Sequence, residues 1–412
     1  MTKQNNNPHN ELKDIAIVGG GMVGMAAAIS LSQLNLKIIL IENILVKDGS
    51  HPSYDDRTLV VNRGSIRFWK NIGVWNSLSD IVTPIKKVHV SNKGFFGTVQ
   101  FDSKTFNINA LAYIVEAKRL GLTLKSKIES DKNITVVCPA KVSSFVSGDE
   151  MISIKYMTNG KAYTINSKLM LAADGIQSNI RQQLNLETII KSYHRTAIVC
   201  NITPEHKHNN CAFERLTKSG PTALLPFVEN RCGFVWTVAK DMAEDILNLS
   251  DEEFLKSAQD QFGYRLGKFI KVGKRSSYPL YLVSVPKQVK SRVILLGNAA
   301  HGMSPISAQG LNLAVRDVAN LVAVINQAIL DNNDIGSDDV LNRYQDSVRK
   351  DQTQTMQYTD DLMGWFSVDL PVVNVVRSLA MVVFNLSKSA KYELFTRASG
   401  YRGKTPKLLR SK

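Results

Sequence analysis

Three short segments, far apart in the chain, combine glycine with polar residues at spacings that suit the binding of a phosphate-bearing ligand. They are GGGMVG at 19–24, DGIQSNIR at 174–181 and GNAAHGMSPISAQGLN at 297–312. Glycine lets a backbone approach a phosphate closely, and the amides at a helix N-terminus attract negative charge. The chemistry indicated is the binding of a dinucleotide, and the elements that flank each segment must position it.

The first segment lies between a predicted strand and a predicted helix, as a dinucleotide site requires. An apolar run at 15–18 precedes it, and an alanine-rich stretch follows it. In this G-x-G-x-x-G pattern Gly19 permits the tight turn, Gly21 lets the backbone approach a pyrophosphate, and Gly24 lets the helix pack on the strand. These residues predict an adenine-dinucleotide site at the start of the helix.

A carboxylate at the end of the next apolar run narrows the choice of dinucleotide. Glu42 follows the run at 37–41, where its oxygens can accept hydrogen bonds from an adenosine ribose. The same negative charge would repel a 2′-phosphate. The sequence therefore favours FAD or NAD over NADP at this site.

The length of the chain and its pattern of apolar and polar residues predict an α/β fold with two domains and a helical C-terminal region. Its 412 residues, 44% hydrophobic and 21% charged, are ordinary for a protein with a full core. A discontinuous Rossmann-like domain is expected over residues 10–85, 105–190 and 282–337. An inserted, mostly antiparallel substrate-binding sheet is expected over residues 86–104 and 191–281, and C-terminal helices with a basic tail over residues 338–412.

Local patterns predict several elements near the three segments. Apolar spacing indicates a helix over residues 107–127, which carries Arg119, and another helix from about Gln309 to Leu330. Residues 86–101 are typical of a hairpin that turns near Gly94. The second segment follows the last strand of a small antiparallel meander at 133–171.

The charge of the chain is strongly positive, at 51 basic against 36 acidic residues, or +15. This balance suits an anionic surface such as a membrane or an acidic partner, or else it reflects a compositional bias of the source organism. No nucleic-acid-binding module is present. The pair His206 and His208 has no further ligands nearby, so no metal site is predicted. Four scattered cysteines favour a reduced, cytoplasmic chain without disulfides: Cys138, Cys200, Cys211 and Cys232.

The longest apolar stretch, residues 371–386, is interrupted by Asn374, Arg377 and Ser378. It is too short and too polar to span a bilayer. Two interpretations remain open for it. It either lies on a membrane as an amphipathic helix or docks against its own protein, which is the commoner use of such a helix.

In this order, the three segments make the chain resemble the FAD-dependent aromatic hydroxylases, which are single-component flavoprotein monooxygenases. The resemblance spans nearly the whole length and implies FAD as cofactor and NAD(P)H as electron donor. It implies that the ADP half of FAD is bound by Gly19, Gly21, Gly24 and Glu42. It assigns to the motif shared by FAD and NAD(P)H the residues Asp174, Gly175, Ser178 and Arg181.

The same resemblance assigns the third segment to the flavin half of the cofactor. Gly297 and Asn298 would lie at the ribityl chain and pyrophosphate, and the ring would be bordered by Pro305, Gln309, Gly310 and Asn312. Asn298 stands where most of the family has aspartate, but an amide oxygen can still accept a hydrogen bond from a ribityl hydroxyl. Ala308 replaces a usual glycine, which would strain the loop if this position requires a positive φ.

Within the family, the ubiquinone-biosynthesis branch is the most similar. The residues that carry this resemblance are HPSYDDR at 51–57, IGVWNSLSD at 72–80, AFERLTKSGPTALLP at 212–226 and FGYRLGKFIKVGKRSSYPL at 262–280. It implies that Arg57 lies against the flavin, although a salt bridge with Asp55 or Asp56 would also explain this residue. Arg119 lies in the helix that usually contacts the FAD pyrophosphate.

The resemblance implies a ring hydroxylation of a polyprenylated phenol of the 2-polyprenyl-6-methoxyphenol type. NAD(P)H would reduce FAD, and O2 would react at the flavin C4a to give the hydroperoxide that hydroxylates the ring. No catalytic base is assigned, because Tyr193, His194 and Tyr278 are explained as well by structural roles. Two other functions remain open: an FAD-dependent prenyl-lipid reductase or dehydrogenase, and a non-catalytic scaffold in a quinone-biosynthesis complex.

A prenylated substrate bears on where the protein works. Each buried CH₂ contributes about 0.8 kcal/mol, so such a substrate stays in a bilayer or on a lipid carrier. Each basic residue near an anionic surface contributes about 1 kcal/mol. The sequence therefore predicts a cytoplasmic protein that associates with the inner membrane, or with a lipid carrier or another ubiquinone-biosynthesis protein.

Overall fold

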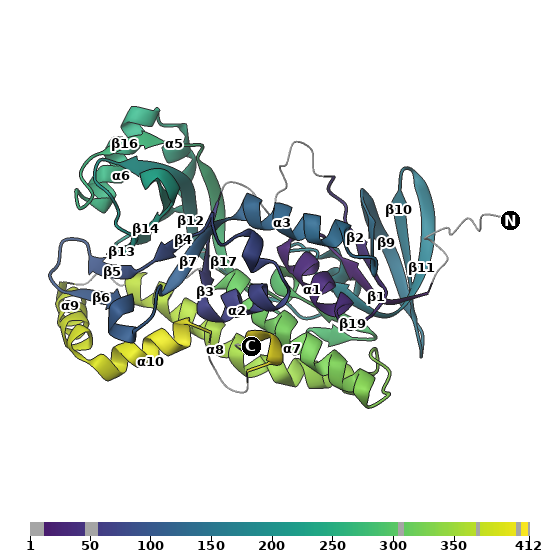
Figure 1. Ribbon diagram of the computed structural model, residues 1–412. Helices are drawn as coiled ribbons and strands as arrows, with labels where there is room; N and C mark the ends of the chain where they lie inside the picture. Colours follow the sequence, from purple (N-terminus) through teal and green to yellow (C-terminus); the bar gives the residue numbers. More distant parts are fainter. Residues whose placement is uncertain (1–11, 46–56, 304–308, 368–370, 401–404, 411–412) are drawn as a thin grey trace.

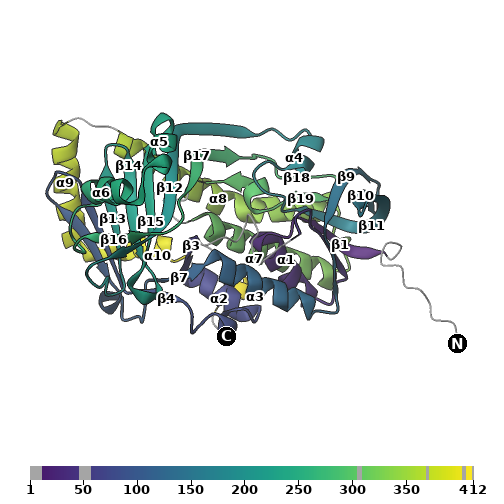
Figure 2. The same ribbon diagram turned by 90° about the horizontal axis from the view of Figure 1, so that it is seen from above.

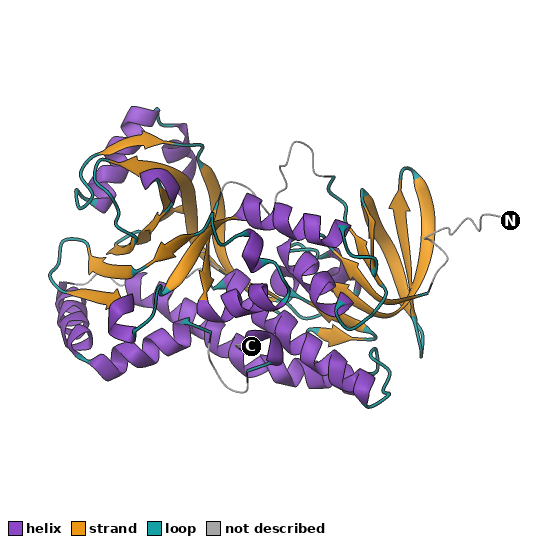
Figure 3. Ribbon diagram, in the orientation of Figure 1, coloured by secondary structure: helices purple, strands orange, loops and turns teal. Residues whose placement is uncertain are grey.

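The computed structural model describes residues 12–45, 57–303, 309–367, 371–400 and 405–410, which form an elongated molecule with three β-sheets (Figure 1). The two larger sheets lie towards opposite ends, and helices pack between and beneath them (Figure 3). The predicted fold class, an α/β dinucleotide-binding unit with a mostly antiparallel second sheet and C-terminal helices, is confirmed.

The first sheet has the central order β18-β19-β11-β1-β2-β8. Its strands are β1 (Lys13–Val18), β2 (Ile38–Ile41), β8 (Ile134–Val137), β9 (Ala140–Ser147), β10 (Ile152–Thr158), β11 (Lys161–Ala172), β18 (Val289–Lys290) and β19 (Val293–Leu295). The five strands β8, β2, β1, β11 and β19 are parallel, whereas β9, β10 and β11 form an antiparallel meander.

Both faces are buried along residues 15–18 of β1 and along β2, which explains why these two runs are apolar. Ile15 and Ile17 pack into one core with α1 (Met22–Ser32), α3 (Ala117–Glu129) and α7 (Gly310–Leu330). Ala16 and Val18 point to the other face and pack against the meander. Alternation of side chains between two covered faces requires a continuous apolar run instead of an alternating one.

The register of the parallel strands brings the three glycine-bearing segments together. Val18 pairs with Ala172, and Ala172 pairs with Leu295, so the three strands end at the same level. Backbone hydrogen bonds continue past the strand ends, from Ala173 N to Val18 O and from Leu296 N to Ala172 O, both at 2.8 Å. The three turns that follow therefore share one edge of the sheet, where ligands bind in such folds.

The second sheet is antiparallel except for the parallel pair β5 and β13. Its order is β20-β17-β12-β15-β14-β13-β5-β6, with β16 paired to β12. Its strands are β5 (Lys87–Asn92), β6 (Thr98–Asp102), β12 (Ile189–Pro204), β13 (Cys211–Thr217), β14 (Gly220–Pro226), β15 (Cys232–Ala239), β16 (Phe269–Val272), β17 (Ser276–Ser284) and β20 (His301–Gly302). The short strand β20 belongs to the third segment, so this segment joins the two sheets.

One face of the second sheet is covered by α5 (Ala243–Asn248) and α6 (Asp251–Phe262), as the view from above shows (Figure 2). Helix α6 begins at a capping box, in which the Ser250 hydroxyl accepts a hydrogen bond from Glu253 N and the Glu253 carboxylate accepts one from Ser250 N. Aromatic side chains, among them Phe234, Phe254 and Phe262, fill the space between helix and sheet. The opposite face is left to a cavity described below.

The third sheet corrects one local prediction. A helix was predicted over residues 107–127, but residues 112–116 form β7 (Ala112–Glu116) between β3 (Thr58–Asn62) and β4 (Thr83–Ile85), and α3 begins only at Ala117. The helical spacing was wrong there because β7 is held by two strands distant in sequence, and such pairing overrides a local pattern. Helix α2 (Arg63–Asn71) follows β3 directly.

The C-terminal region is helical, as predicted, with α8 (Asp338–Ser367), α9 (Pro371–Leu386) and α10 (Lys388–Ala398). A short helix, α4 (Asn179–Gln183), completes the α-helices named here. Among the described residues, α7 alone is long and apolar enough to cross a membrane, with a mean hydropathy of 1.4 in its most apolar window, and 61% of that window is buried. Helix α7 packs in the main core, as a core helix of this length would.

Candidate active site

The first turn is built so closely that only glycine fits. Gly19 has a φ of +105°, and a Cβ atom there would lie 2.3 Å from the Ala173 carbonyl oxygen. A Cβ on Gly24 would lie 1.9 Å from the carbonyl oxygen of Gly19 itself. Gly21 is the N-cap of α1 and supplies no side chain, so the first amides of the helix face outward without a side-chain cap. The turn thus presents a helix N-terminus suited to an anion.

Glu42 lies beside this turn, at the carboxyl end of β2. One carboxylate oxygen accepts a hydrogen bond from the backbone N–H of Gly20, and the other accepts one from Ile44 N at 2.6 Å. These two bonds hold the carboxylate across the turn. A carboxylate held in this position can accept hydrogen bonds from the hydroxyls of a ribose.

Asp174 follows β11 and carries a buried acceptor. Its Oδ2 accepts a hydrogen bond from Ile180 N at 3.2 Å, whereas its buried Oδ1 has no hydrogen-bond partner among the described residues. Burial raises the pKa of this carboxyl, and the nearby Ser178 hydroxyl and backbone amides oppose the rise. Gly175, with a φ of +86°, turns the chain away immediately afterwards. A buried acceptor without a partner indicates a ligand that supplies a donor.

Ser178 and Arg181 hold the second turn together. The Ser178 hydroxyl accepts a hydrogen bond from Arg181 N at 3.0 Å and caps α4. The buried guanidinium of Arg181 donates to Ile176 O at 2.8 Å and to Ala299 O at 2.9 Å. Both side chains therefore bind the protein's own backbone, and Arg181 links the second turn to the third.

The third turn lies against the first. Gly297 has a φ of +56°, and a Cβ there would lie 3.1 Å from the side chain of Val23, in the first turn of α1. Asn298 follows with its side chain exposed at the edge of the sheet. Two of the three segments are thus in direct contact, and Arg181 connects the remaining one.

The start of α7 has few neighbours among the residues that the structure describes. Within that part of the chain, its N-cap Gln309 makes no side-chain cap, and a Cβ added to Gly310 would meet no atom within 4 Å. This leaves space and an uncapped helix N-terminus, whose positive end favours negative charge. Pro305 lies outside the described residues.

Asn312, one turn into α7, is fully engaged inside the protein. Its Oδ1 accepts hydrogen bonds from Asn62 N at 3.1 Å and from the Ser65 hydroxyl at 2.7 Å. Its Nδ2 donates to Val60 O at 2.9 Å. The residue connects α7 to the junction of β3 and α2, and so it positions the helix whose first residues border the open space.

The two predicted arginines have different surroundings. The guanidinium of Arg57 lies 4.7 Å from the ring centre of Tyr278, at cation–π distance. The two aspartates that precede Arg57 lie outside the described residues. Arg119 is exposed on α3, with its Nε 3.7 Å from a Glu116 carboxylate oxygen. The contact with Tyr278 joins the residue directly before β3 to β17 of the second sheet, and sequence spacing could not indicate it.

A cavity of about 340 Å³ lies between the second sheet and the start of α7. Its walls come from the bare face of the sheet, from β3 and β4, and from α7, α8 and α10. Most of the lining is apolar, including Val88, Val90, Phe101, Ala212, Ala223, Leu225 and Val235. Gln309 and Asn312 line it at the α7 end. The cavity draws on elements from the whole chain, so local sequence patterns did not reveal it.

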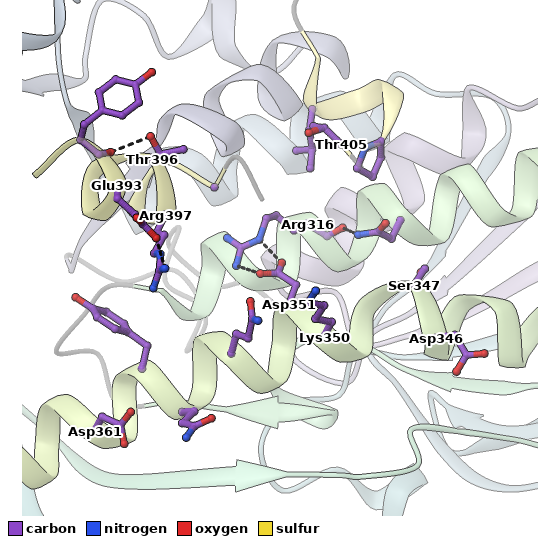
Figure 4. A pocket seen from close by; sticks show the side chains of 18 residues that line it. Arg316, Asp346, Ser347, Lys350, Asp351, Asp361, Glu393, Thr396, Arg397 and Thr405 are labelled. Atoms are coloured by element: carbon purple, nitrogen blue, oxygen red, sulfur yellow. Dashed lines mark hydrogen bonds and ion pairs between the residues drawn. The ribbon is translucent and has the colours of Figure 1, made fainter. Parts of the chain in front are cut away.

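A larger groove of about 1090 Å³ adjoins the cavity between α8 and α10 (Figure 4). Most of its lining residues are polar or charged, and among them Arg316 donates from Nε to an Asp351 carboxylate oxygen at 2.6 Å. Cavity and groove share five lining residues: Arg316, Asp351, Tyr358, Arg397 and Gly400. The two spaces are therefore neighbours, one apolar and one polar.

Comparison with known proteins decides what this arrangement is. The FAD binding domain family matches residues 13–359. The chain is also 30% identical to the ubiquinone hydroxylase UbiL of Rhodospirillum rubrum, over 90% of this chain and 86% of UbiL. The chain belongs to the FAD-dependent monooxygenase family. The predicted family, enzyme class and FAD cofactor are thereby confirmed, and NAD(P)H is the usual electron donor of this family.

Other members of the FAD-dependent monooxygenase family agree. The chain is 26% identical to the mitochondrial ubiquinone biosynthesis monooxygenase COQ6 of Dictyostelium discoideum, over 91% of this chain and 89% of that one. The solved structure of p-nitrophenol 4-monooxygenase PnpA from Pseudomonas putida superposes with a TM-score of 0.79 at 15% identity, covering 95% of this chain and all of PnpA. That likeness shows a shared fold.

The residues present fit the family's FAD. The close glycine turn accommodates a pyrophosphate at the α1 N-terminus, and the unpartnered Oδ1 of Asp174 suits a hydroxyl donor of the cofactor. Open space at Gly310 and the adjoining apolar cavity leave room for a ring system beside a substrate. Among the described residues, no group of three or more His, Cys, Asp or Glu side chains is arranged to bind a metal ion.

Proposed function

We propose that this protein is an FAD-dependent hydroxylase of a polyprenylated phenol in ubiquinone biosynthesis, with a substrate of the 2-polyprenyl-6-methoxyphenol type. The observation that carries the proposal is the apolar cavity that meets the uncapped start of α7 beside the three glycine turns. A phenol with an apolar tail suits such a lining. The relatives UbiL and COQ6, which are named for ubiquinone hydroxylation and biosynthesis, support the assignment.

In this proposal the chain's residues hold the cofactor from the first turn to the start of α7. Gly19, Gly21, Gly24 and Glu42 hold the ADP half, and Gly297 and Asn298 hold the ribityl chain and pyrophosphate. Asp174 and Gly175 border both parts, and Arg119 faces the pyrophosphate. Gln309, Gly310 and Arg57 border the flavin ring. When bound, FAD accepts a hydride from NAD(P)H and uses O2 as the source of the transferred oxygen atom.

The other task of the protein is to position the phenol and exclude water. The valine, alanine and leucine side chains of the second sheet offer no hydrogen bonds to water in the cavity. Exclusion of water limits the hydrolysis of reactive intermediates and strengthens electrostatic interactions in the site. The helix N-terminus at Gly310 supplies a fixed positive potential beside the ring.

Oxygen transfer tests the function. The purified FAD-loaded protein would be mixed with NADH or NADPH, 18O2 and 2-methoxyphenol bearing one short prenyl chain. The expected product is a catechol or hydroquinone that contains one labelled oxygen atom. Consumption of NAD(P)H with a reduced, unlabelled product would instead identify a reductase or dehydrogenase. Protein that never binds flavin would identify a scaffold.

We also propose that α9 rests on an anionic bilayer, where a prenylated substrate is found. Its exposed apolar residues recur every three or four positions and so lie on a single face of the helix: Val375, Val376, Leu379, Val382, Val383 and Leu386. The other face docks on β6, through Met381 and Phe384. Both interpretations of this segment are thus combined, because one face packs internally while the other stays apolar and exposed. The net charge of +15 favours anionic lipids.

Vesicle flotation tests the membrane contact. The protein is expected to float with vesicles of phosphatidylglycerol and phosphatidylcholine at low salt, and less at high salt. Val383, 67% exposed on α9, is changed to Asp, and Ile270, 61% exposed on β16, is changed to Asp as the control. V383D should reduce vesicle binding about tenfold, and I270D should not. Absence of binding at either salt concentration would direct attention to a lipid carrier or another ubiquinone-biosynthesis protein.

A further inference from the structure

A single carboxyl group interrupts the apolar sheet face that lines the cavity. Glu214 lies in the middle of β13 and pairs with Val90 of β5 on one side and Ala223 of β14 on the other. Ala223 pairs in turn with Val235 of β15. Paired residues in neighbouring strands share a face of the sheet, and all four residues line the cavity. Glu214 is thus an acidic residue among valine and alanine.

The structure gives the Glu214 carboxylate no hydrogen-bond or ion-pair partner among the described residues. Burial raises its pKa to about 7. Glu214 is half-buried against the apolar walls of the cavity, and a carboxylate in such surroundings without a partner is costly, so such residues occur mainly where a ligand uses them. An apolar residue at this position would complete the face at lower cost, and a structural role does not explain the carboxyl.

The arginine and aspartate side chains that line the cavity are paired with other side chains. Arg316 is bonded to Asp351, and Arg397 to Glu393. Tyr358 lines the cavity from α8. On the opposite sheet face, burial lowers the pKa of His89, whose Nε2 lies 2.6 Å from Arg265 Nη1.

Two cysteines of the same sheet, Cys211 on β13 and Cys232 on β15, also have pKa values far from neutral pH. Burial raises the pKa of Cys211 to about 11 and that of Cys232 to about 12. Among the described residues that line this cavity, Glu214 is therefore the group whose pKa is raised to near neutral pH.

We infer that Glu214 holds the phenol hydroxyl of the substrate and takes its proton as the ring is oxidised, a role that rests on the proposed function. The hydroxyl O–H donates to the carboxylate in the bound state. During oxidation by an O2-derived oxygen atom, the phenol O–H bond breaks, its electron pair stays on the phenol oxygen, and a new O–H bond forms on the carboxylate. Loss of this proton makes the ring more electron-rich and so more reactive towards an electrophilic oxygen.

The position of Glu214 suits this role. Gln309 and Asn312, at the α7 end, line the same cavity, so the carboxyl and the expected place of the flavin ring border one space. A general base is most effective when its pKa lies near the operating pH. A hydrogen bond that stabilises the charged form also lowers the pKa, so phenol binding should release protons near neutral pH.

Binding of 2-methoxy-6-(3-methylbut-2-enyl)phenol to the FAD-loaded protein, in the absence of NAD(P)H, tests the inference. Calorimetry between pH 5.5 and 8.5, in two buffers with different ionisation enthalpies, gives both the dissociation constant and the protons released. The native protein is expected to bind about tenfold more tightly at pH 8.5 than at pH 5.5 and to release protons near pH 7. E214Q should bind about tenfold more weakly at pH 8.5, independently of pH and without proton release.

The matched control is E229Q, because Glu229 is 81% exposed and lies outside the cavity lining. Its binding and proton release should equal those of the native protein. Native protein that binds and hydroxylates the phenol without pH dependence or proton release overturns the role of Glu214 alone, even if E214Q does not fold. Native protein that holds FAD but binds no phenol overturns both this inference and the proposed function.

Discussion

Arg181 donates from Nη1 to the carbonyl oxygen of Ala299 at 2.9 Å, so a side chain of the second glycine-bearing segment holds the backbone of the third. The same guanidinium binds Ile176 O in its own turn. A planar, always charged group with several donors can bridge two carbonyl oxygens in this way, and a lysine cannot reproduce the geometry. The convergence of two segments therefore depends on one buried arginine.

We expect R181K to destabilise the protein by about 2 kcal/mol, because at least one buried carbonyl oxygen loses its partner. The dissociation constant for FAD should rise as the two turns separate. Thermal unfolding and flavin fluorescence on titration with FAD measure the two effects. K125A, which alters an exposed Lys125–Glu129 pair, is the control and should leave both unchanged. Native FAD affinity in R181K would contradict the coupling of the turns.

Gly24 offers a test of the glycine cradle. A methyl group there would lie 1.9 Å from the Gly19 carbonyl oxygen, so G24A should cost about 3 kcal/mol and abolish tight FAD binding. The matched control is G364A, where a Cβ on α8 meets no atom of the described residues within 4 Å. G364A should stabilise the protein by about 0.5–1 kcal/mol, because alanine favours a helix over glycine. Denaturant unfolding and the flavin absorbance of the purified variants give the result.

The pH dependence of stability should report on Glu214. Its pKa rises from an ordinary 4.5 to about 7 through burial. A carboxyl whose pKa is higher in the folded state contributes stability that is present below pH 4.5 and is lost as the pH rises through about 7. The apoprotein should therefore lose up to about 3 kcal/mol relative to E214Q across this interval. Thermal melting of the two proteins at pH 5 and pH 8 measures this loss. A difference in melting temperature between them that is the same at both pH values would contradict the raised pKa of Glu214.

The pair His301 and Asp317 should be needed to hold the third segment on α7. His301 Nε2 lies 2.5 Å from an Asp317 carboxylate oxygen, and Gln352 Nε2 donates to the same oxygen at 3.0 Å. D317A removes the carboxylate that binds buried His301 and one of the partners of Gln352, and it should cost about 3 kcal/mol. D331A, on the exposed end of α7, should cost less than about 0.5 kcal/mol. Denaturant midpoints distinguish the two variants, and equal midpoints would exclude this role.

Much of the cofactor half of the protein was predictable from local patterns. The apolar runs before Gly19 and Glu42, which flank the glycine turn, form strands buried on both faces. The start of α3 was wrong, because β7 is determined by β3 and β4. The predicted roles of individual residues towards FAD stay predictions, which the variants above test.

The sequence by itself determined the dinucleotide turn, the fold class and the family, because glycine spacing and buried-strand patterns depend on near neighbours. Only the tertiary structure decided that Arg181 hydrogen-bonds to Ala299 and that Asn312 hydrogen-bonds to the junction of β3 and α2. It also decided that Glu214 faces an apolar cavity. Those relationships join residues more than a hundred positions apart, or depend on which face of a strand is covered. Such contacts depend on how whole sheets and helices pack together, and a local sequence pattern does not indicate this packing.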